Sequence, residues 1–166
     1  FAVSASEPFR IVDTIGGTGV LMTSGPLNAD PSGRQPLILV VAQLAGGQDA
    51  KIEELSEALL KQTRGFADAT IEKREKERFA DMDGYLLAGS DSAGKRFEHH
   101  LAIGSGGHFV RLIAMAPAAD FDGLKPAIDK VATSVALQPG RCRAHLAEAR
   151  ERLRERKRPC RQHRRC

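Results

Sequence analysis

Three of the five histidines lie in neighbouring apolar segments and are the residues best suited by type to bind a metal ion or move a proton. His99 and His100 are adjacent, and adjacent residues on a β-strand point to opposite faces of the sheet. If a hairpin turns between residues 105 and 106, His108 shares a face with His99. The two then lie about 13 Å apart. Ligand bonds to zinc are only about 2 Å long, so we expect no metal site here.

The same hairpin register gathers a polar group on the other face of the sheet. It places His100 opposite Arg111, with Glu98 two residues along the strand from His100. An imidazole, a carboxylate and a guanidinium at this spacing are more typical of an ion-pair patch than of a catalytic unit. We predict that Glu98, His100 and Arg111 form a polar, partner-facing cluster without a catalytic role.

No other motif supports catalysis or cofactor binding. Gly104-Ser105-Gly106 fits a hairpin turn and lacks the flanking pattern of the strained elbow that carries a nucleophilic serine. The glycine-rich stretch 16–19 lacks the Lys-Ser/Thr pair that ends a phosphate-binding loop. Cys142 and Cys160 lack the paired close spacing of zinc ligands. The sequence therefore predicts a protein that is not an enzyme, with no catalytic residue, no metal and no cofactor.

Charge is distributed unevenly along the 166 residues. Residues 141–166 carry 11 Lys/Arg and 3 Asp/Glu and hold all 3 cysteines, whereas residues 1–140 carry 14 Lys/Arg and 18 Asp/Glu. The body is thus mildly acidic although the net charge is +4, so we expect no basic nucleic-acid-binding surface on it. No apolar run approaches the ~20 residues of a membrane-spanning helix.

The basic, Cys-containing tail over residues 139–166 allows three interpretations. It could form a helix up to residue 157, although its apolar side is thin. Clustered Lys and Arg are typical of a segment that binds nucleic acid or an acidic partner. A solvated tail has a similar composition, and so does a non-native extension, because this mixture of residues also arises when GC-rich DNA is read out of frame. Nucleic acid is expected as a partner only through this tail.

We expect one domain over residues 9–138, preceded by a flexible N-terminus over residues 1–8. Residues 3–8 resemble the small-residue end of a secretory signal, with cleavage after Ala5. A body free of cysteine also suits an exported bacterial protein. The sequence thus favours a periplasmic or otherwise exported location in the bacterial envelope.

Residues 96–117 form the predicted hairpin that carries His99, His100 and His108, and we call it the histidine hairpin. Hydrophobic patterns place it within a mainly antiparallel sheet of about six strands. Residues 9–15 and 20–23 fit a first hairpin. The run 36–44 is the most hydrophobic, which fits a central strand covered on both faces. The histidine hairpin, 96–117, carries apolar residues on both faces, which favours helices on both sides of the sheet.

Residues 69–80 are the hardest segment to assign. Their Glu, Lys and Arg residues favour a helix. However, Gly65 ends the helix before them, and a strand would make a charged sheet edge that deters aggregation. We predict a strand here, followed by a turn at 81–84 and another strand at 85–90.

Two main amphipathic helices are expected. The first covers residues 50–64 after Asp49 as N-cap, with apolar side chains at helical spacing on one face. The second covers residues 123–136 after Asp120 or Asp122 as a cap. Together, the strands and helices predict an α/β/α sandwich.

The order of these elements resembles the PsbP-like superfamily of α/β/α sandwiches, which includes bacterial periplasmic DcrB-like proteins. The segments that carry the resemblance are residues 52–66, 83–85, 96–115, the Ala116-Pro117 step and the helix end at 130–137, KVATSVAL. The likeness runs from residue 8 to residue 138. It implies an exported accessory or binding module that assists a larger complex or an envelope process. It implies neither catalysis nor any site residue.

We therefore predict a non-catalytic exported accessory module that binds a protein partner in the cell envelope, across a sheet face that the helices leave open. The alternative is a carrier of a small apolar or lipid ligand between sheet and helix, for which a closed apolar cavity is expected. A weaker alternative is an enzyme without a recognisable motif, which would need a concave site with converging titratable groups.

Overall fold

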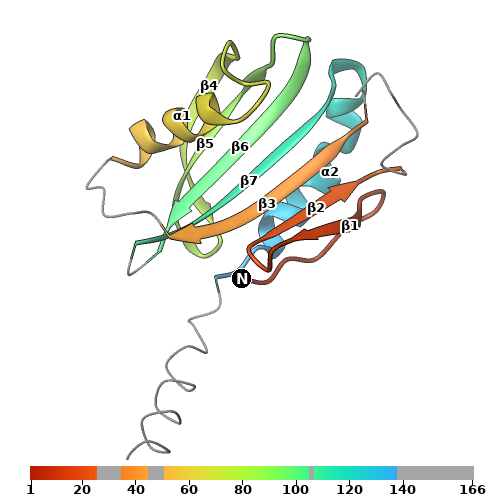
Figure 1. The fold of residues 1–166 in the computed structure, drawn as a ribbon. Coiled ribbons are helices and arrows are strands. Elements are labelled where there is room, and N and C mark those ends of the chain that lie inside the picture. The colour runs from red at the N-terminus through yellow and green to blue at the C-terminus, as the bar shows by residue number, and fades with distance from the viewer. Residues whose placement is uncertain (26–34, 45–50, 105–106, 138–166) are drawn as a thin grey trace, which may run out of the picture.

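A computed structural model describes residues 1–25, 35–44, 51–104 and 107–137. In this part of the chain, a seven-stranded antiparallel sheet carries one helix on each face (Figure 1). The expected α/β/α sandwich is confirmed, with seven strands in place of about six. The predictions about Asp49 and about the tail from residue 139 lie outside the described residues.

The elements follow the expected order along the chain. They are β1 (Arg10–Ile15), β2 (Gly19–Thr23), β3 (Leu37–Leu44), α1 (Ile52–Gln62), β4 (Thr70–Phe79), β5 (Met82–Ser90), β6 (Lys95–Ile103), β7 (His108–Pro117) and α2 (Ala118–Ser134). In the sheet the strands lie in the order β1-β2-β3-β7-β6-β5-β4. Two antiparallel meanders, β1 to β3 and β4 to β7, therefore meet where β3 pairs with β7.

The charged segment 69–80 is a strand, as predicted. β4 pairs with β5 from Thr70 to Phe79 and forms one edge of the sheet. α1 ends at Gln62 with Thr63 as its C-cap, and Gly65, with a φ of 90° that favours glycine, lies in the segment between α1 and β4. Ion pairs run along β4, for example between Lys73 and Glu75. A charged edge of this kind resists pairing with a second chain.

The turn before β5 is shorter than predicted. Ala80 and Asp81 have φ values of 53° and 61° and form a two-residue hairpin, so β5 begins at Met82 and not at residue 85. Positive φ at both positions is the geometry of a type I′ turn, whose twist matches that of the paired strands. Gly and Asn normally signal this turn. The prediction instead placed the turn at residues 81–84 because of Gly84, but Gly84 is buried within β5.

α2 begins earlier than predicted, at Ala118 in place of residue 123. Asp120 therefore lies in the first turn, and the N-cap position is Pro117, which makes no side-chain cap. β7 runs directly into the helix because the fixed φ of proline suits a helix start. Phe121, only 4% exposed, anchors the first turn against the core. The packing of Phe121 therefore sets the start of α2, and a prediction based on N-cap residues alone does not take this packing into account.

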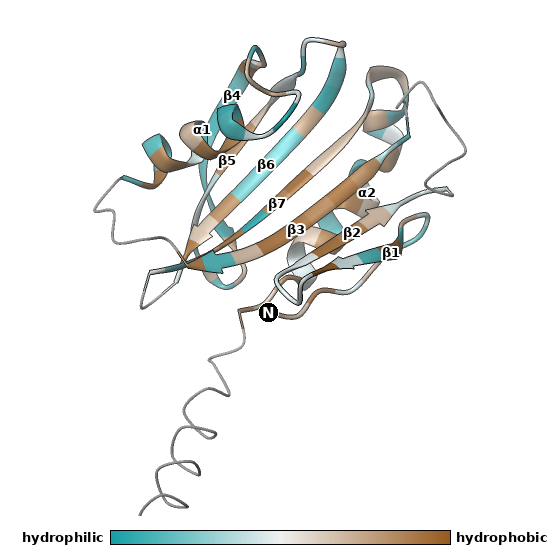
Figure 2. Cartoon of the chain, in the orientation of Figure 1, coloured by the Kyte–Doolittle hydropathy of each residue, from teal (hydrophilic) through white to brown (hydrophobic). Residues whose placement is uncertain are grey.

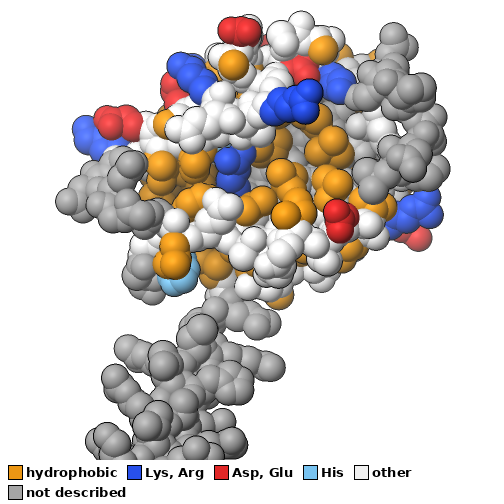
Figure 3. Space-filling view, in the orientation of Figure 1, with side chains coloured by type: hydrophobic (Ala, Val, Ile, Leu, Met, Phe, Trp, Pro, Cys, Tyr) orange, Lys and Arg blue, Asp and Glu red, His pale blue; other side chains and the backbone are white. Residues whose placement is uncertain are grey.

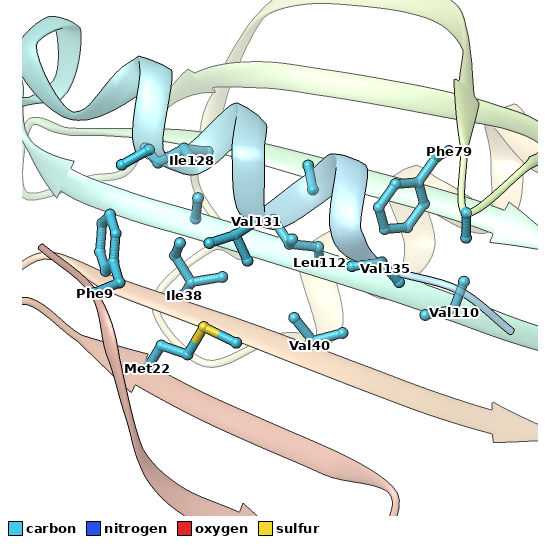
Figure 4. Close-up of a cluster of buried hydrophobic side chains, with 14 of the residues drawn as sticks. Phe9, Met22, Ile38, Val40, Phe79, Val110, Leu112, Ile128, Val131 and Val135 are labelled. Atoms are coloured by element: carbon cyan, nitrogen blue, oxygen red, sulfur yellow. The ribbon is translucent and has the colours of Figure 1, made fainter. Parts of the chain in front are cut away.

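Two apolar clusters hold the layers together. The larger lies between the sheet and α2, as Figure 4 shows, and includes Met22, Ile38, Leu112, Ile128 and Val131, all at 0% exposure. The smaller lies under α1 and includes Leu60, Phe66, Leu87, Phe97 and Ile113. α1 is two residues shorter at each end than predicted, and it buries only two of its residues, against five for α2. α2 is therefore the more firmly packed layer.

Among the described residues, β3 is fully covered on one face only, which corrects the prediction of a strand covered on both. Ile38 and Val40 point toward α2 and have no solvent exposure. Leu37, Leu39 and Val41 alternate with them on the other face and are only half-buried. The hydrophobic run is visible along β3 in Figure 2. α1 packs over β5 and β6 and does not extend across this strand.

The first residues pair with the end of α2. The backbones of Ala2 and Ala136 exchange two hydrogen bonds, at 2.8 and 3.0 Å, and Phe1 and Val3 pack against the larger cluster. The structure thus attaches residues that the sequence assigned to a flexible N-terminus, while the domain boundaries stay a prediction. Within the described ranges, neither helix has the length and hydropathy needed to cross a membrane.

Candidate functional site

The histidine hairpin closes one residue further along β7 than predicted. Ile103 pairs with Phe109, and the Gly104 amide donates to the His108 carbonyl at 2.7 Å. The connection is therefore longer than a two-residue turn, and Gly107 adopts a φ of 73° in it. A one-residue shift of register moves side chains to the opposite face. The pairing expected for His108 was wrong for this reason.

The predicted cluster of Glu98, His100 and Arg111 is consequently divided between the two faces. Glu98 and His100 share the α2 face, where they are 6% and 5% exposed. Arg111 pairs with Leu101 and lies on the α1 face. The structure brings two of the three residues together and separates the third. A partner-facing role for the set stays a prediction, and the burial of Glu98 and His100 lends it no support.

On the α2 face, His100 lies in a charged cluster in which Glu98 Oε2 and His100 Nε2 are buried without a hydrogen-bond partner among the described residues. Its Nδ1 is 2.8 Å from Glu77 Oε1, and its Nε2 is 3.6 Å from Glu98 Oε2. The Lys125 Nζ of α2 lies 3.1 Å from the same Glu98 oxygen. Burial lowers the pKa of His100, but the hydrogen bonds and charges of Glu77 and Glu98 outweigh it and raise the pKa to about 8. This cluster ties β4, β6 and α2 together.

Sequence reasoning missed Glu77 and Lys125 because both come from elements whose position depends on the tertiary fold. Glu77 reaches the cluster from edge strand β4, where it pairs with Gly84. A Cβ on Gly84 would lie 2.9 Å from the Leu101 carbonyl oxygen, so only glycine fits there without movement. In the sequence, a glycine inside a predicted strand was the one available signal that another backbone, here that of β6, lies close to it.

On the α1 face, a buried and a half-buried ionisable side chain have incomplete pairing. His99 is 0% exposed, and its Nδ1 lies 3.4 Å from Ser56 Oγ. Burial, with the Arg111 and His100 charges, holds the pKa of His99 well below its usual range. The Arg111 Nη2 donates to Thr63 Oγ1 at 2.6 Å. His99 Nε2 and Arg111 Nε are buried without a hydrogen-bond partner among the described residues.

Beside α1, the same face of the sheet is apolar and incompletely covered. We call it the open sheet face, and its described members from β2, β3 and β7 are Leu21, Leu37, Leu39, Val41, Arg111 and Met115. All are half-buried. Figure 3 shows hydrophobic side chains gathered between α1 and the β1–β2 hairpin, with a basic side chain in their midst. Ile15, 48% exposed, pairs with Gly19 at the border of this face.

The described residues offer another place where a ligand could be sought. A shallow depression of about 470 Å³ lies on α1 and is lined by Glu53, Glu54, Glu57, Ala58 and Lys61. Its charged lining does not suit an apolar ligand. No group of three or more His, Cys, Asp or Glu side chains within the described ranges is arranged to hold a metal ion. The open sheet face is therefore the best candidate site.

Comparison with known proteins identifies the fold. No family model and no curated protein matches the sequence. Among the solved structures that are similar to this chain, three have 14–16% sequence identity with it. LpqN, involved in cell envelope biogenesis of Mycobacterium tuberculosis, has 16% identity and a TM-score of 0.63 over 83% of each chain.

The other two structures show the same fold. PA94 of Pseudomonas aeruginosa, a protein of unknown function described as a putative regulator, has 16% identity and a TM-score of 0.52 over 84% of this chain and 98% of its own. Cyanobacterial PsbP (CyanoP) from Synechocystis sp. PCC 6803 has 14% identity and a TM-score of 0.54 over 77% and 81%. The resemblance to the PsbP-like fold is thereby confirmed.

Proposed function

We propose that the chain is a non-catalytic accessory module that binds a protein partner across the open sheet face. The observation that carries this proposal is the one-sided cover of β3, whose Leu37, Leu39 and Val41 stay half-buried beside α1. Contiguous exposed apolar surface on a soluble domain commonly marks an interaction site. Completing the burial of each aliphatic side chain would contribute about 1 kcal/mol, which is enough for several together to support binding.

The ionisable groups support a non-catalytic role. A general acid or base must reach the proton that it transfers. His100 is instead enclosed by Glu77, Glu98 and α2, and His99 lies under α1 beside Ser56. His100 joins β4 and α2 to β6, and His99 contacts α1, so each histidine has a structural role.

An exported location is supported by likeness of fold. LpqN is described as taking part in cell envelope biogenesis, and this chain shares its fold over most of its length. The part of the sequence before residue 141 also contains no cysteine. On these grounds we place the module in the bacterial envelope.

Site-specific photo-crosslinking tests the proposal. A photoreactive amino acid replaces Leu39 in the full chain in cells of the native host, and a control chain carries it at Ser92, an exposed position in the β5–β6 turn. We expect protein adducts from position 39 that are absent from position 92 and that Leu21→Asp abolishes. Adducts with lipid alone, or the same proteins from both positions, would overturn the proposal.

A further inference from the structure

We infer that the open sheet face receives an amphipathic helix of the partner, whose apolar stripe carries an acidic side chain that pairs with Arg111. The inference rests on the proposed function and adds the form and chemistry of the partner. It combines two observations: the dimensions of the uncovered part of the sheet, and a guanidinium with unused donors in the middle of aliphatic side chains.

The uncovered strands leave room for one helix beside α1. Neighbouring strands lie about 4.8 Å apart, so β7 to β1 spans about 14 Å. A helix with its side chains is about 10 Å wide, and packed helices lie about 8–10 Å apart. α1 packs over β5 and β6 on this face. A second helix placed over β3 would therefore continue the layer that α1 begins.

The length of the apolar floor fits a short helical segment. Leu37 to Val41 extends for about 13 Å along β3. At a rise of 1.5 Å per residue, this distance corresponds to roughly nine residues of helix. Such a segment presents anchors at positions i, i+3 or i+4, and i+7. Leu21 of β2 and Met115 of β7 widen the floor on either side of β3.

Arg111 determines the charge of the partner. It is the only Lys or Arg in the sequences of β2, β3 and β7. Its Nη2 donates to Thr63 Oγ1 at 2.6 Å and its Nη1 to the Leu59 carbonyl at 3.5 Å, while Nε is buried without a partner among the described residues. A guanidinium has five N–H donors, and a carboxylate can accept two of them. An acidic side chain reaching Arg111 would satisfy donors that the described residues leave unused.

Other occupants fit the face less well. An extended peptide adds to the edge of a sheet, where backbone groups are unpaired, and not to its face. A small amphiphile needs a site that encloses most of its surface. Among the described residues, the open sheet face is bordered by α1 and by the β1–β2 hairpin, and none of them encloses it (Figure 3). A helix needs burial along one stripe only, which is what this face supplies.

Selection from a displayed helix library tests the inference. The helices are about 18 residues, or five turns, long, with an apolar stripe whose central position is Asp, Glu, Gln, Lys or Leu, and the target is the full chain. We expect Asp and Glu to be enriched at that position. Replacing the selected acid by its amide should weaken binding by at least about 30-fold, as for a desolvated ion pair.

Four variants of the chain locate the binding. Leu39→Asp should abolish it, whereas Ser92→Asp, with the same change in charge on an exposed turn, should leave it unchanged. Arg111→Glu should reverse the preference from acidic to lysine-containing helices. Because Arg111 also contacts α1, thermal unfolding of each variant is measured, and Arg111→Lys, which retains the charge, should still favour acidic helices.

The outcomes separate this inference from the proposed function. Enrichment of acidic helices that depend on Leu39 supports it, and so does a cross-linked native segment whose helical stripe contains Asp or Glu. Selected helices without an acidic preference, or with binding unaffected by Leu39→Asp, would overturn the inference while protein adducts at position 39 keep the proposed function. Adducts only with lipid or with a second copy of this chain would overturn both.

Discussion

The two faces of the sheet bury ionisable side chains in opposite ways. His99 and His100 are consecutive on β6 and almost equally buried. On the α2 face, His100 meets two carboxylates, and its pKa rises to about 8. On the α1 face, His99 meets a hydroxyl and the Arg111 charge, and its pKa falls well below the usual range. Burial lowers the pKa of both histidines and is the main cause of the shift of His99; only at His100 do the neighbouring carboxylates reverse the direction.

The apolar groups divide in the same way. The α2 face is closed over Ile38 and Val40, while the α1 face leaves Leu37, Leu39 and Val41 half-buried. The α2 face is thus the more completely packed of the two. Each face keeps two buried polar atoms without a hydrogen-bond partner among the described residues: Glu98 Oε2 and His100 Nε2 on the α2 face, and His99 Nε2 and Arg111 Nε on the α1 face. An incomplete face costs stability in isolation. It is the expected arrangement where a partner supplies the missing contacts.

The largest effect should come from a cavity on the closed face. Leu112→Ala should lower the free energy of unfolding by about 3 kcal/mol, because Leu112 has no exposure between the sheet and α2. Leu39→Ala, the same change on the open sheet face, should cost less than about 1 kcal/mol. Urea unfolding of both variants measures the difference. Equal losses would contradict the division between the faces.

Breaking the ion-pair cluster on the α2 face should have the next largest effect. Glu77→Gln should lower the free energy of unfolding by about 2 kcal/mol, because it leaves the buried His100 charge with one carboxylate fewer. Glu75→Gln is the matched control: it is two residues away on β4, and its ion pair with Lys73 is exposed. This control should change stability by less than about 0.5 kcal/mol. Similar losses of stability for the two variants in thermal or urea unfolding would show that the buried ion pairs stabilise the fold no more than the exposed one.

The pH dependence of stability should separate the two histidines. The folded-state pKa of His100 is about 8, above its ordinary value of 6.5, so the folded chain binds the proton more tightly. Its contribution, roughly 2 kcal/mol, is fully present below pH 6.5 and is lost as the pH rises through about 8. The lowered pKa of His99 acts in the opposite sense. Its contribution is present above pH 6.5 and is lost as the pH falls below that value.

Nuclear magnetic resonance of the imidazole rings checks this prediction residue by residue. We expect one buried ring to titrate near pH 8 and the other to stay neutral down to the pH at which the chain unfolds. Urea unfolding between pH 6 and 9 should show stability that falls on the alkaline side, and Glu77→Gln should reduce that slope. Two rings that titrate together near the ordinary histidine value would contradict the assignment of the cluster.

Local signals in the sequence were sufficient to predict the type of most elements. The strand over 69–80 was predicted against its helix propensity because Gly65 was expected to end the preceding helix, and the structure has β4 there. The start of α2 could not be predicted in this way, because the packing of Phe121 sets it. Element type thus depends on the local pattern, while element boundaries depend on contacts that the sequence does not display.

The candidate site was harder to predict because it depends on register and on layer width. The longer connection after Ile103 moved Arg111 to the other face. The prediction assumed a two-residue turn at Ser105 and Gly106, although Gly107, with a φ of 73°, suits a longer loop. The apolar run of β3 indicated cover on both faces, but α1 lies over β5 and β6 and does not reach it. The apolar residues were therefore identified from the sequence, whereas their exposure was visible only in the fold.

The smallest effect should come from the weakest polar contact on the α1 face. Ser56→Ala removes the hydroxyl 3.4 Å from His99 Nδ1, a distance at the outer limit of hydrogen bonding. We expect a loss of less than about 1 kcal/mol in urea unfolding, well below that of Glu77→Gln. The neutral state of His99 does not depend on Ser56, because burial and the charges of Arg111 and His100 lower its pKa. His99 Nε2 also has no partner among the described residues. A loss as large as that of Glu77→Gln would mean that the α1 face is held by polar contacts as firmly as the α2 face.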